Sequence, residues 1–335
     1  MRLSELGEFG LIEKIRNKIG PPGGEVIKGI EDDCAVVESS GGKVYLYTTD
    51  ILVEGIHFKR AFSDPVNLGR KALAVNISDI AAMGGKPLYA LFSLGAPKSS
   101  EVIFIDSMIS GISSMAKEYG IDLVGGDTSL SPEALFINIF LVGESEKDTV
   151  LYRSGAGAGQ VIFVTGEVGS SAAGLDVLKR AINIKKYAPL TEAHLTPRPH
   201  IKEGEIISSS GLATSLIDIS DGVIADLGHI CEESKVGAVI KQSDLPILEL
   251  CYQYCANYGL KAADFALYGG EDYVLMGTVP EHSYYELRDL MNSEGCPLFP
   301  VGRTKAEPGI RLQNQNGGIT AVEINGYDHF KNRGD

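Results

Sequence analysis

The sequence predicts an α/β protein made of two halves of similar size, and two observations carry this prediction. Strand-like apolar segments alternate with helix-like segments along the chain, as in folds that cover a sheet with helices. A single stretch, 144–160, is polar and then rich in glycine and alanine, and it interrupts the alternation. We therefore expect one domain over 1–148 and a second over 149–335.

In the first half, the best-defined element is a helix over 65–83. Asp64 can cap it, Pro65 suits its first position, and Gly84-Gly85 ends it. Two further helices are expected at 9–19 and 102–119. Strands are expected at 34–37, 44–48, 88–94, 123–124 and 135–142.

The second half repeats the alternation. A proline-broken segment, HLTPRPH, separates its first strand and helix from the rest, and the tail from Pro297 is predicted to form short strands and turns. The expected strands are 161–164, 215–219, 238–241 and 273–279, and the expected helices are 171–181, 223–233, 248–258 and 284–294.

Composition excludes several classes of protein. Of the 335 residues 44% are hydrophobic, which is enough for a large core, yet no apolar run reaches the roughly 18 residues of a membrane span. The net charge of −14 argues against a nucleic-acid surface. The charged N-terminal segment has no apolar signal-peptide core, and the five cysteines fit small buried side chains in a reducing compartment. We expect a cytoplasmic protein with no membrane and no nucleic-acid partner.

Carboxylates follow or precede two strands of the first half. Asp33 precedes CAVV, and Thr48-Thr49-Asp50 ends an apolar strand. Oxygen-only groups at a buried strand end suit a hard cation such as Mg²⁺, and ligands bind beyond strand ends in open α/β sheets. Taken alone, the Asp33 segment is better explained by an Asp-rich turn, and an ordinary polar strand end explains Thr48-Thr49-Asp50 about as well as a metal site does.

Asp79 is a sharper signal, because it interrupts an apolar helix face. An unpaired buried carboxylate is costly, so it needs a cation, a metal or hydrogen-bond donors, and a metal is favoured over a structural salt bridge. The face consists of Leu68, Ala72, Val75, Asp79, Ala82 and Met83.

Glycine pairs and strand ends present further carboxylates. Asp127 follows Gly125-Gly126 after the short strand 123–124, and Glu271 follows Gly269-Gly270. Asp218, Ser220 and Asp221 lie in IDISDG, which runs from a strand into a helix. Turns and a helix N-cap are the alternative explanations, and for Asp221 the N-cap is a strong one.

Common phosphate-binding motifs are missing. The sequence has no G-x-x-x-x-G-K-[ST] loop and no protein-kinase H-R-D or D-F-G set. A nucleotide would therefore be held mainly through metals bridging carboxylates to phosphates. Arg153 could contact phosphate or be a solvated linker arginine, and His57 could be a core residue or a ligand contact.

Ten segments, in order, resemble the thiamine-monophosphate kinase family. Together they span nearly the full chain, so the match is far more specific than any one of them. They are GEFGLI, DDCAVV, TTDILVEGIHF, KALAVNISDIAAMG, GGDT, RSGA, SSAAGL, IDISDG, ADLGHI and GGEDY.

The resemblance implies a fold and a reaction. The family lies in the aminoimidazole-ribonucleotide synthetase superfamily, whose N-terminal sheet pairs across a homodimer into a barrel and whose C-terminal domain is α/β. The reaction would convert ATP and thiamine monophosphate to ADP and thiamine diphosphate, with several Mg²⁺ ions and no phospho-enzyme. No residue is expected to act as a general base.

The resemblance also assigns residues. Gly126, Asp127, Arg153 and Ser220 would contact ATP, and His57, Glu271 and Tyr327 would contact the substrate. Tyr327 replaces the tryptophan common in the family and can still stack. Glu31 replaces a glycine before the Asp pair, which puts the shape of that loop in doubt. The Mg²⁺ ligands would be Asp33, Thr48, Thr49, Asp50, Asp79, Asp127, Asp218 and Asp221.

Two alternatives remain. Another ATP-using enzyme of the superfamily is one, although the chain has neither an N-terminal reactive cysteine before Cys34 nor a cysteine-bearing tail. A non-catalytic metal or nucleotide sensor is the other, but such a protein should have lost acidic positions that are all filled here.

Overall fold

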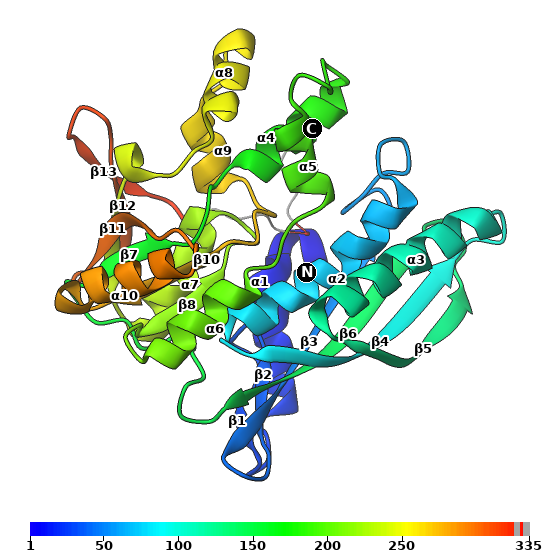
Figure 1. The fold of residues 1–335 in the computed structure, drawn as a ribbon, viewed down its shortest axis with the longest axis horizontal. Coiled ribbons are helices and arrows are strands. Elements are labelled where there is room, and N and C mark those ends of the chain that lie inside the picture. The colour runs from blue at the N-terminus through cyan, green and yellow to red at the C-terminus, as the bar shows by residue number, and fades with distance from the viewer. Residues whose placement is uncertain (325–328, 331–335) are drawn as a thin grey trace.

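The computed structural model describes residues 1–324 and 329–330, and among these the strands form two sheets (Figure 1). The first sheet has the order β1-β2-β3-β6-β4-β5, and only β4 and β5 pair in parallel. Its elements are α1 (Leu3–Ile19), β1 (Val26–Lys28), β2 (Ala35–Glu38), β3 (Lys43–Val53), α2 (Pro65–Ala82), β4 (Lys86–Ala96), α3 (Val102–Tyr119), β5 (Asp122–Leu130) and β6 (Phe136–Glu146).

The second sheet has the order β13-β12-β9-β11-β7-β10-β8, and its strands all come from beyond residue 160. The predicted boundary between 148 and 149 lies in the segment that joins the two sheets and stays a prediction. The elements are β7 (Val161–Val164), α4 (Ser170–Arg180), α5 (Ala188–Leu195), α6 (Ile201–Ser210), β8 (Ser215–Asp218), α7 (Val223–Ser234), β9 (Gly237–Lys241), the short 3₁₀ helix η1 (Gln242–Asp244), α8 (Glu249–Tyr258), α9 (Ala262–Tyr268), β10 (Leu275–Val279), α10 (Glu281–Ser293), β11 (Phe299–Lys305), β12 (Gly309–Gln313) and β13 (Ile319–Val322).

The central helix α2 begins as predicted but is buried differently. Asp64 accepts hydrogen bonds from the backbone N–H groups of Val66 and Asn67, and Pro65 opens the helix. The predicted apolar face is only part of its buried surface, because α2 is buried on nearly every side. It packs against α3, where a Cβ added at Gly69 would lie 1.9 Å from the carbonyl oxygen of Met108.

The same helix joins the two halves. A Cβ added at Gly204 of α6 would lie 2.2 Å from the carbonyl oxygen of Ala81, so α6 and the end of α2 are in backbone contact. Ala81 and Ala82 also belong to a hydrophobic core whose other buried members come from the second half. Residues near the end of α2 therefore lie between the two halves.

Two segments differ from the predicted strands. The GGDT segment does not follow a short strand but lies within β5, which is exposed along its whole length. A Cβ at Gly126 would lie 1.7 Å from the carbonyl oxygen of Phe92, so glycine is needed where β5 pairs with β4 near a bulge. The strand expected from Tyr273 begins instead at Leu275, because Tyr273 has a φ of 53°.

Most other predictions of elements are confirmed within a few residues, including the short strands after Pro297. The sequence missed β1, α5, α6 and α9, which are short. All five cysteines are buried and free, as expected. Within the described part of the chain, no helix is both long and apolar enough to cross a bilayer.

Candidate metal and phosphate site

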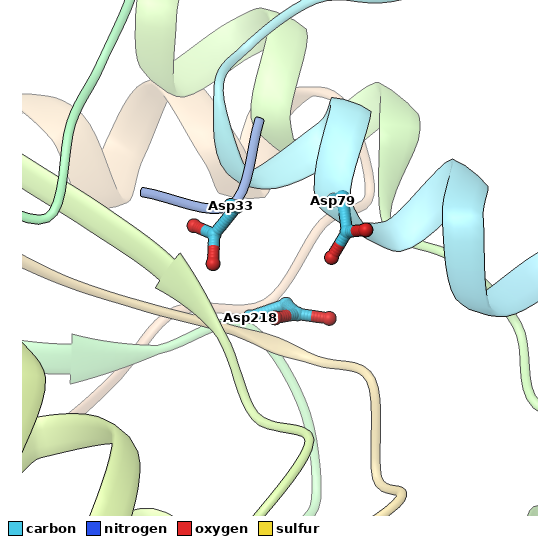
Figure 2. A group of neighbouring side chains, drawn as sticks. All are labelled: Asp33, Asp79 and Asp218. Atoms are coloured by element: carbon cyan, nitrogen blue, oxygen red, sulfur yellow. The ribbon is translucent and has the colours of Figure 1, made fainter. Parts of the chain in front are cut away.

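Three aspartates from distant parts of the chain meet between the two halves (Figure 2). Asp33 lies just before β2, Asp79 lies in the last turn of α2, and Asp218 ends β8. One carboxylate oxygen from each lies within 4.8 Å of the others. We call Asp33, Asp79 and Asp218 the aspartate cluster.

Ionisation of all three carboxylates of the aspartate cluster is unfavourable in this buried environment. Burial, followed by the neighbouring Asp33 carboxylate, raises the pKa of Asp218 to about 8. Burial and then Asp50 and Asp218 raise the pKa of Asp79 well above its usual value. Like charges in a poorly solvated site disfavour joint ionisation, so a cation between them would relieve the repulsion.

Hydrogen-bond donors orient each carboxylate. Thr48 Oγ1 of β3 donates to Asp79, and Ser78 Oγ donates to Asp218 Oδ2 at 2.6 Å. The Arg153 guanidinium donates to Asp33 Oδ1 through Nε at 3.0 Å. Asp33 Oδ2 is buried and has no hydrogen-bond partner among the described residues. A buried carboxylate oxygen without a donor fits a metal ligand, and all-oxygen groups suit Mg²⁺.

Asp50 extends the cluster along β3. Its backbone N–H donates to Asn76 Oδ1 at 3.0 Å, and burial raises the pKa of Asp50 to about 6. The strand alternation places Thr48 and Asp50 on the covered side and Thr49 on the exposed side, where Thr49 Oγ1 donates to Asn138 Oδ1 at 3.3 Å. Within one chain, Thr49 therefore does not join the cluster.

Asp127 and Gly126 are also remote from the cluster within one chain. They lie on β5 at the edge of the first sheet, three strand positions from β3, or about 14 Å at usual strand spacing. Figure 1 shows β5 on the side of that sheet away from the second half. If Asp127 contributes to the site, it must come from another copy of the chain.

Ser220 and Asp221 form the turn between β8 and α7, next to the cluster. Burial and then the Glu8 carboxylate of α1 raise the pKa of Asp221 to about 6. Asp226 of α7 accepts hydrogen bonds on Oδ2 from the backbone N–H groups of Asp221 and Gly222, at 3.1 and 3.0 Å. Asp226 was not predicted as a site residue, although a carboxylate on the apolar face of a helix is a signal that the sequence carries.

Glu271 is held by two groups that the sequence analysis did not single out. Lys71 Nζ lies 2.7 Å from Glu271 Oε1, and His194 Nδ1 lies 3.1 Å from Oε2. Burial alone would raise the pKa of Glu271, but Lys71 and His194 outweigh it and lower this pKa to about 2. Glu271 has a φ of 67°, a strained backbone of the kind that concentrates at functional sites.

His57 follows β3 and accepts a hydrogen bond on Nδ1 from the backbone N–H of Val53 at 3.0 Å. Its ring lies 5.0 Å from that of His329, near the end of the chain. Burial and then His329 lower the pKa of His57, which favours a neutral ring. Tyr327, the other predicted substrate contact, lies outside the described residues.

Known protein families and individual proteins match nearly the whole chain. Residues 31–145 match the model of the AIR synthase related protein N-terminal domain, and residues 157–314 match that of the C-terminal domain. Thiamine-monophosphate kinase of Aquifex aeolicus is 36% identical over 98% of this chain and 100% of its own. That of Bacillus subtilis is 37% identical over 90% of this chain and 93% of its own.

Solved structures give the same result. A structure described as "AaThiL complexed with AMPPCP and TMP" superposes with a TM-score of 0.87 at 36% identity, covering 98% of this chain and 99% of that one. A hydrogenase maturation protein in complex with ATP has a TM-score of 0.70 at 18% identity and covers 87% of each chain, which shows the fold alone. The chain thus belongs to the thiamine-monophosphate kinase family, within the AIR synthase related proteins.

Proposed function

We propose that this protein phosphorylates thiamine monophosphate to thiamine diphosphate, with ATP as the phosphoryl donor and several Mg²⁺ ions. The observation that carries the proposal is the aspartate cluster, which brings three carboxylates within 4.8 Å between two domains. The full-length relatives named thiamine-monophosphate kinase support the reaction, and AMPPCP, an ATP analogue bound to one of them, supports the donor.

The described residues fit a divalent cation. The cluster offers oxygen ligands only, its carboxylates repel one another, and Asp33 Oδ2 lacks a hydrogen-bond donor. Asp33, Asp79 and Asp218 would hold the metal, and Thr48, Asp50 and Asp221 would complete its surroundings. When bound, Mg²⁺ would supply positive charge against the phosphates of both substrates.

The protein's own groups would position the reactants for direct, in-line transfer. The Arg153 guanidinium already faces the cluster, where it can also contact a phosphate. Ser220 and Gly126 are the other proposed ATP contacts, and His57 and Glu271 would hold the acceptor. A phosphate monoester is largely ionised at neutral pH, so the acceptor oxygen needs no general base.

We further propose a homodimer that uses the uncovered face and the edge of the first sheet. The helices α2 and α3 lie on one face of this sheet (Figure 1), and the other face exposes apolar side chains. Among them are Ile51 of β3 at 48% exposure and Leu91 of β4 at 38%. Exposed apolar side chains on an uncovered sheet face are typical of a protein interface. A second copy would bring Asp127 and Thr49, which are remote from the site of their own chain, toward a shared site.

The oligomeric state can be measured directly. Light scattering after size-exclusion chromatography should give the mass of two chains, and Leu91→Glu should give one. A single-chain mass for the unmodified protein would reject the dimer and leave Asp127 without a role in the site.

Five free, buried cysteines suit a reducing compartment, so we place the protein in the cytoplasm.

Product formation tests the reaction. The purified protein is incubated with ATP, Mg²⁺ and thiamine monophosphate, with unphosphorylated thiamine in a parallel reaction. We expect thiamine diphosphate from the monophosphate, no product from thiamine, and loss of turnover when EDTA is added. Absence of product with intact ATP binding would reject this function and favour another substrate of the superfamily.

A further inference from the structure

We propose that Asp226 is a positioning residue that holds the turn 220–222 in the geometry required both for metal binding and for acceptor binding. The inference rests on the proposed function, because it concerns Asp221 as a metal-site residue and Glu271 as an acceptor contact. Asp226 itself would touch neither substrate nor metal.

Asp226 is buried and its carboxylate is committed to the turn. Its side chain is 2% exposed, and a single oxygen, Oδ2, accepts from the N–H groups of both Asp221 and Gly222. These N–H groups precede the first turn of α7 and would otherwise lack partners. The carboxylate thus fixes the direction in which the Asp221 side chain leaves the backbone.

The turn 220–222 also supports the loop that carries Glu271. The backbone N–H of Glu271 donates to the carbonyl oxygen of Ser220 at 2.8 Å. A Cβ added at Gly270 would lie 2.2 Å from that same carbonyl oxygen, so the loop and the turn are in backbone contact. Gly222 has a φ of 108°, which an L side chain rarely adopts, so the turn has little freedom to relax.

One carboxylate therefore determines the position of two groups with different tasks. Displacing the turn would move Asp221 relative to the aspartate cluster, and it would move Glu271 through the Ser220 carbonyl. We expect a substitution that displaces the acceptor oxygen of Asp226 to weaken Mg²⁺ binding and acceptor binding together. Residues that orient ligands of a metal typically change affinity or activity by about 10–100-fold when they are replaced.

Two substitutions test separately whether the position of the Asp226 acceptor oxygen or the charge of Asp226 matters. Asp226→Asn keeps an oxygen acceptor at the same distance from the backbone and removes the charge. Asp226→Glu keeps the charge and moves the acceptor by one methylene. Cys231→Ala is the control, because Cys231 is also buried on α7 but accepts neither of the hydrogen bonds that Asp226 accepts from the turn.

Three quantities are measured for each protein: the melting temperature, the KM for thiamine monophosphate with kcat, and the calorimetric affinity for Mg²⁺ with AMPPCP present. We expect Asp226→Glu to weaken Mg²⁺ binding and to raise KM by about tenfold or more each. We expect Asp226→Asn to stay within about threefold of the unmodified protein. Cys231→Ala should alter the melting temperature alone.

Two outcomes would overturn the inference. If Asp226→Asn is the more damaging variant, the charge of Asp226 matters and the position of the turn does not. If both variants change only the melting temperature, Asp226 is merely structural. Failure of the proposed function is distinguishable, because the unmodified protein would then make no thiamine diphosphate while the calorimetric comparison would still test the role of Asp226 in metal binding.

Discussion

Ser78 Oγ of α2 donates a hydrogen bond of 2.6 Å to Asp218 Oδ2 at the end of β8, so a helix of the first half is tied to a strand of the second. Ser78 is fully buried, and Asp218 is 2% exposed. The bond crosses the boundary at the aspartate cluster itself. Relative movement of the two halves should therefore be coupled to metal binding, since both depend on the position of Asp218 relative to α2.

The cluster predicts an unusual dependence of stability on pH in the absence of metal. Burial raises the pKa of Asp218 to about 8 and that of Asp50 to about 6, whereas the ordinary value is 3.8. These two carboxylates therefore hold more protons in the folded protein than in the unfolded chain between about pH 4 and 8. Its stability should fall as the pH rises through this window, because these carboxylates must then ionise beside one another.

Thermal unfolding in EDTA and in excess Mg²⁺, at several pH values, measures this effect. In EDTA the melting temperature should fall from pH 5 to pH 8, and the gain from Mg²⁺ should be largest at pH 8, where the ligands are ionised. Asp218→Asn should be more stable than the unmodified protein in EDTA at pH 8. A melting temperature that rises with pH in EDTA would contradict the assigned pKa shifts.

Asp50→Asn should abolish turnover and leave the protein folded. The substitution preserves the shape of the side chain but removes a charge from the proposed metal site, and it relieves repulsion in the free protein. Thiamine diphosphate formation and circular dichroism are the measurements. Asp106→Asn, at an exposed position on α3, is the matched control and should be fully active. Near-normal activity of Asp50→Asn would remove Asp50 from the metal site.

Lys71→Met should impair use of thiamine monophosphate without changing the use of ATP. Lys71 is 3% exposed and pairs with Glu271 at 2.7 Å, so methionine would preserve packing and leave the Glu271 charge with only His194. We expect KM for the acceptor to rise by roughly 30-fold or more, since loss of one partner of a buried charge pair costs about 2–5 kcal/mol. Glu271→Ala should raise it further.

Steady-state kinetics with each substrate varied in turn separates the two effects. Lys117→Met, at an exposed position of α3, serves as the control for loss of one positive charge. Equal increases of KM for ATP and for thiamine monophosphate would take the Lys71–Glu271 pair out of the acceptor site.

The sequence predicted what depends on local pattern. Asp79 stood out because a carboxylate interrupted apolar helix positions, and the structure places it in the aspartate cluster. Lys71 and His194 were missed because their partner, Glu271, is 200 and 77 residues away along the chain. The strand around Asp127 was predicted too short, since two glycines signal a turn unless a close neighbouring backbone requires them.

Glu31 stands where the resemblance described above led us to expect a glycine, and its backbone explains that expectation. Its φ of 149° lies in a region that favours glycine. Arg16 and Lys28 form ion pairs with the Glu31 carboxylate, and the Lys28 Nζ distance is 3.5 Å. Such partly exposed pairs contribute only about 0–1 kcal/mol each.

Glu31→Gly should therefore stabilise the protein relative to Glu31→Ala. Both variants lose the ion pairs with Arg16 and Lys28, but only glycine relieves the backbone strain, which is worth about 1–3 kcal/mol. The greater freedom of glycine in the unfolded chain offsets about 0.5–1 kcal/mol of this gain. Urea unfolding should give a difference near 1 kcal/mol in favour of glycine. A more stable alanine variant would mean that the backbone at Glu31 is not strained.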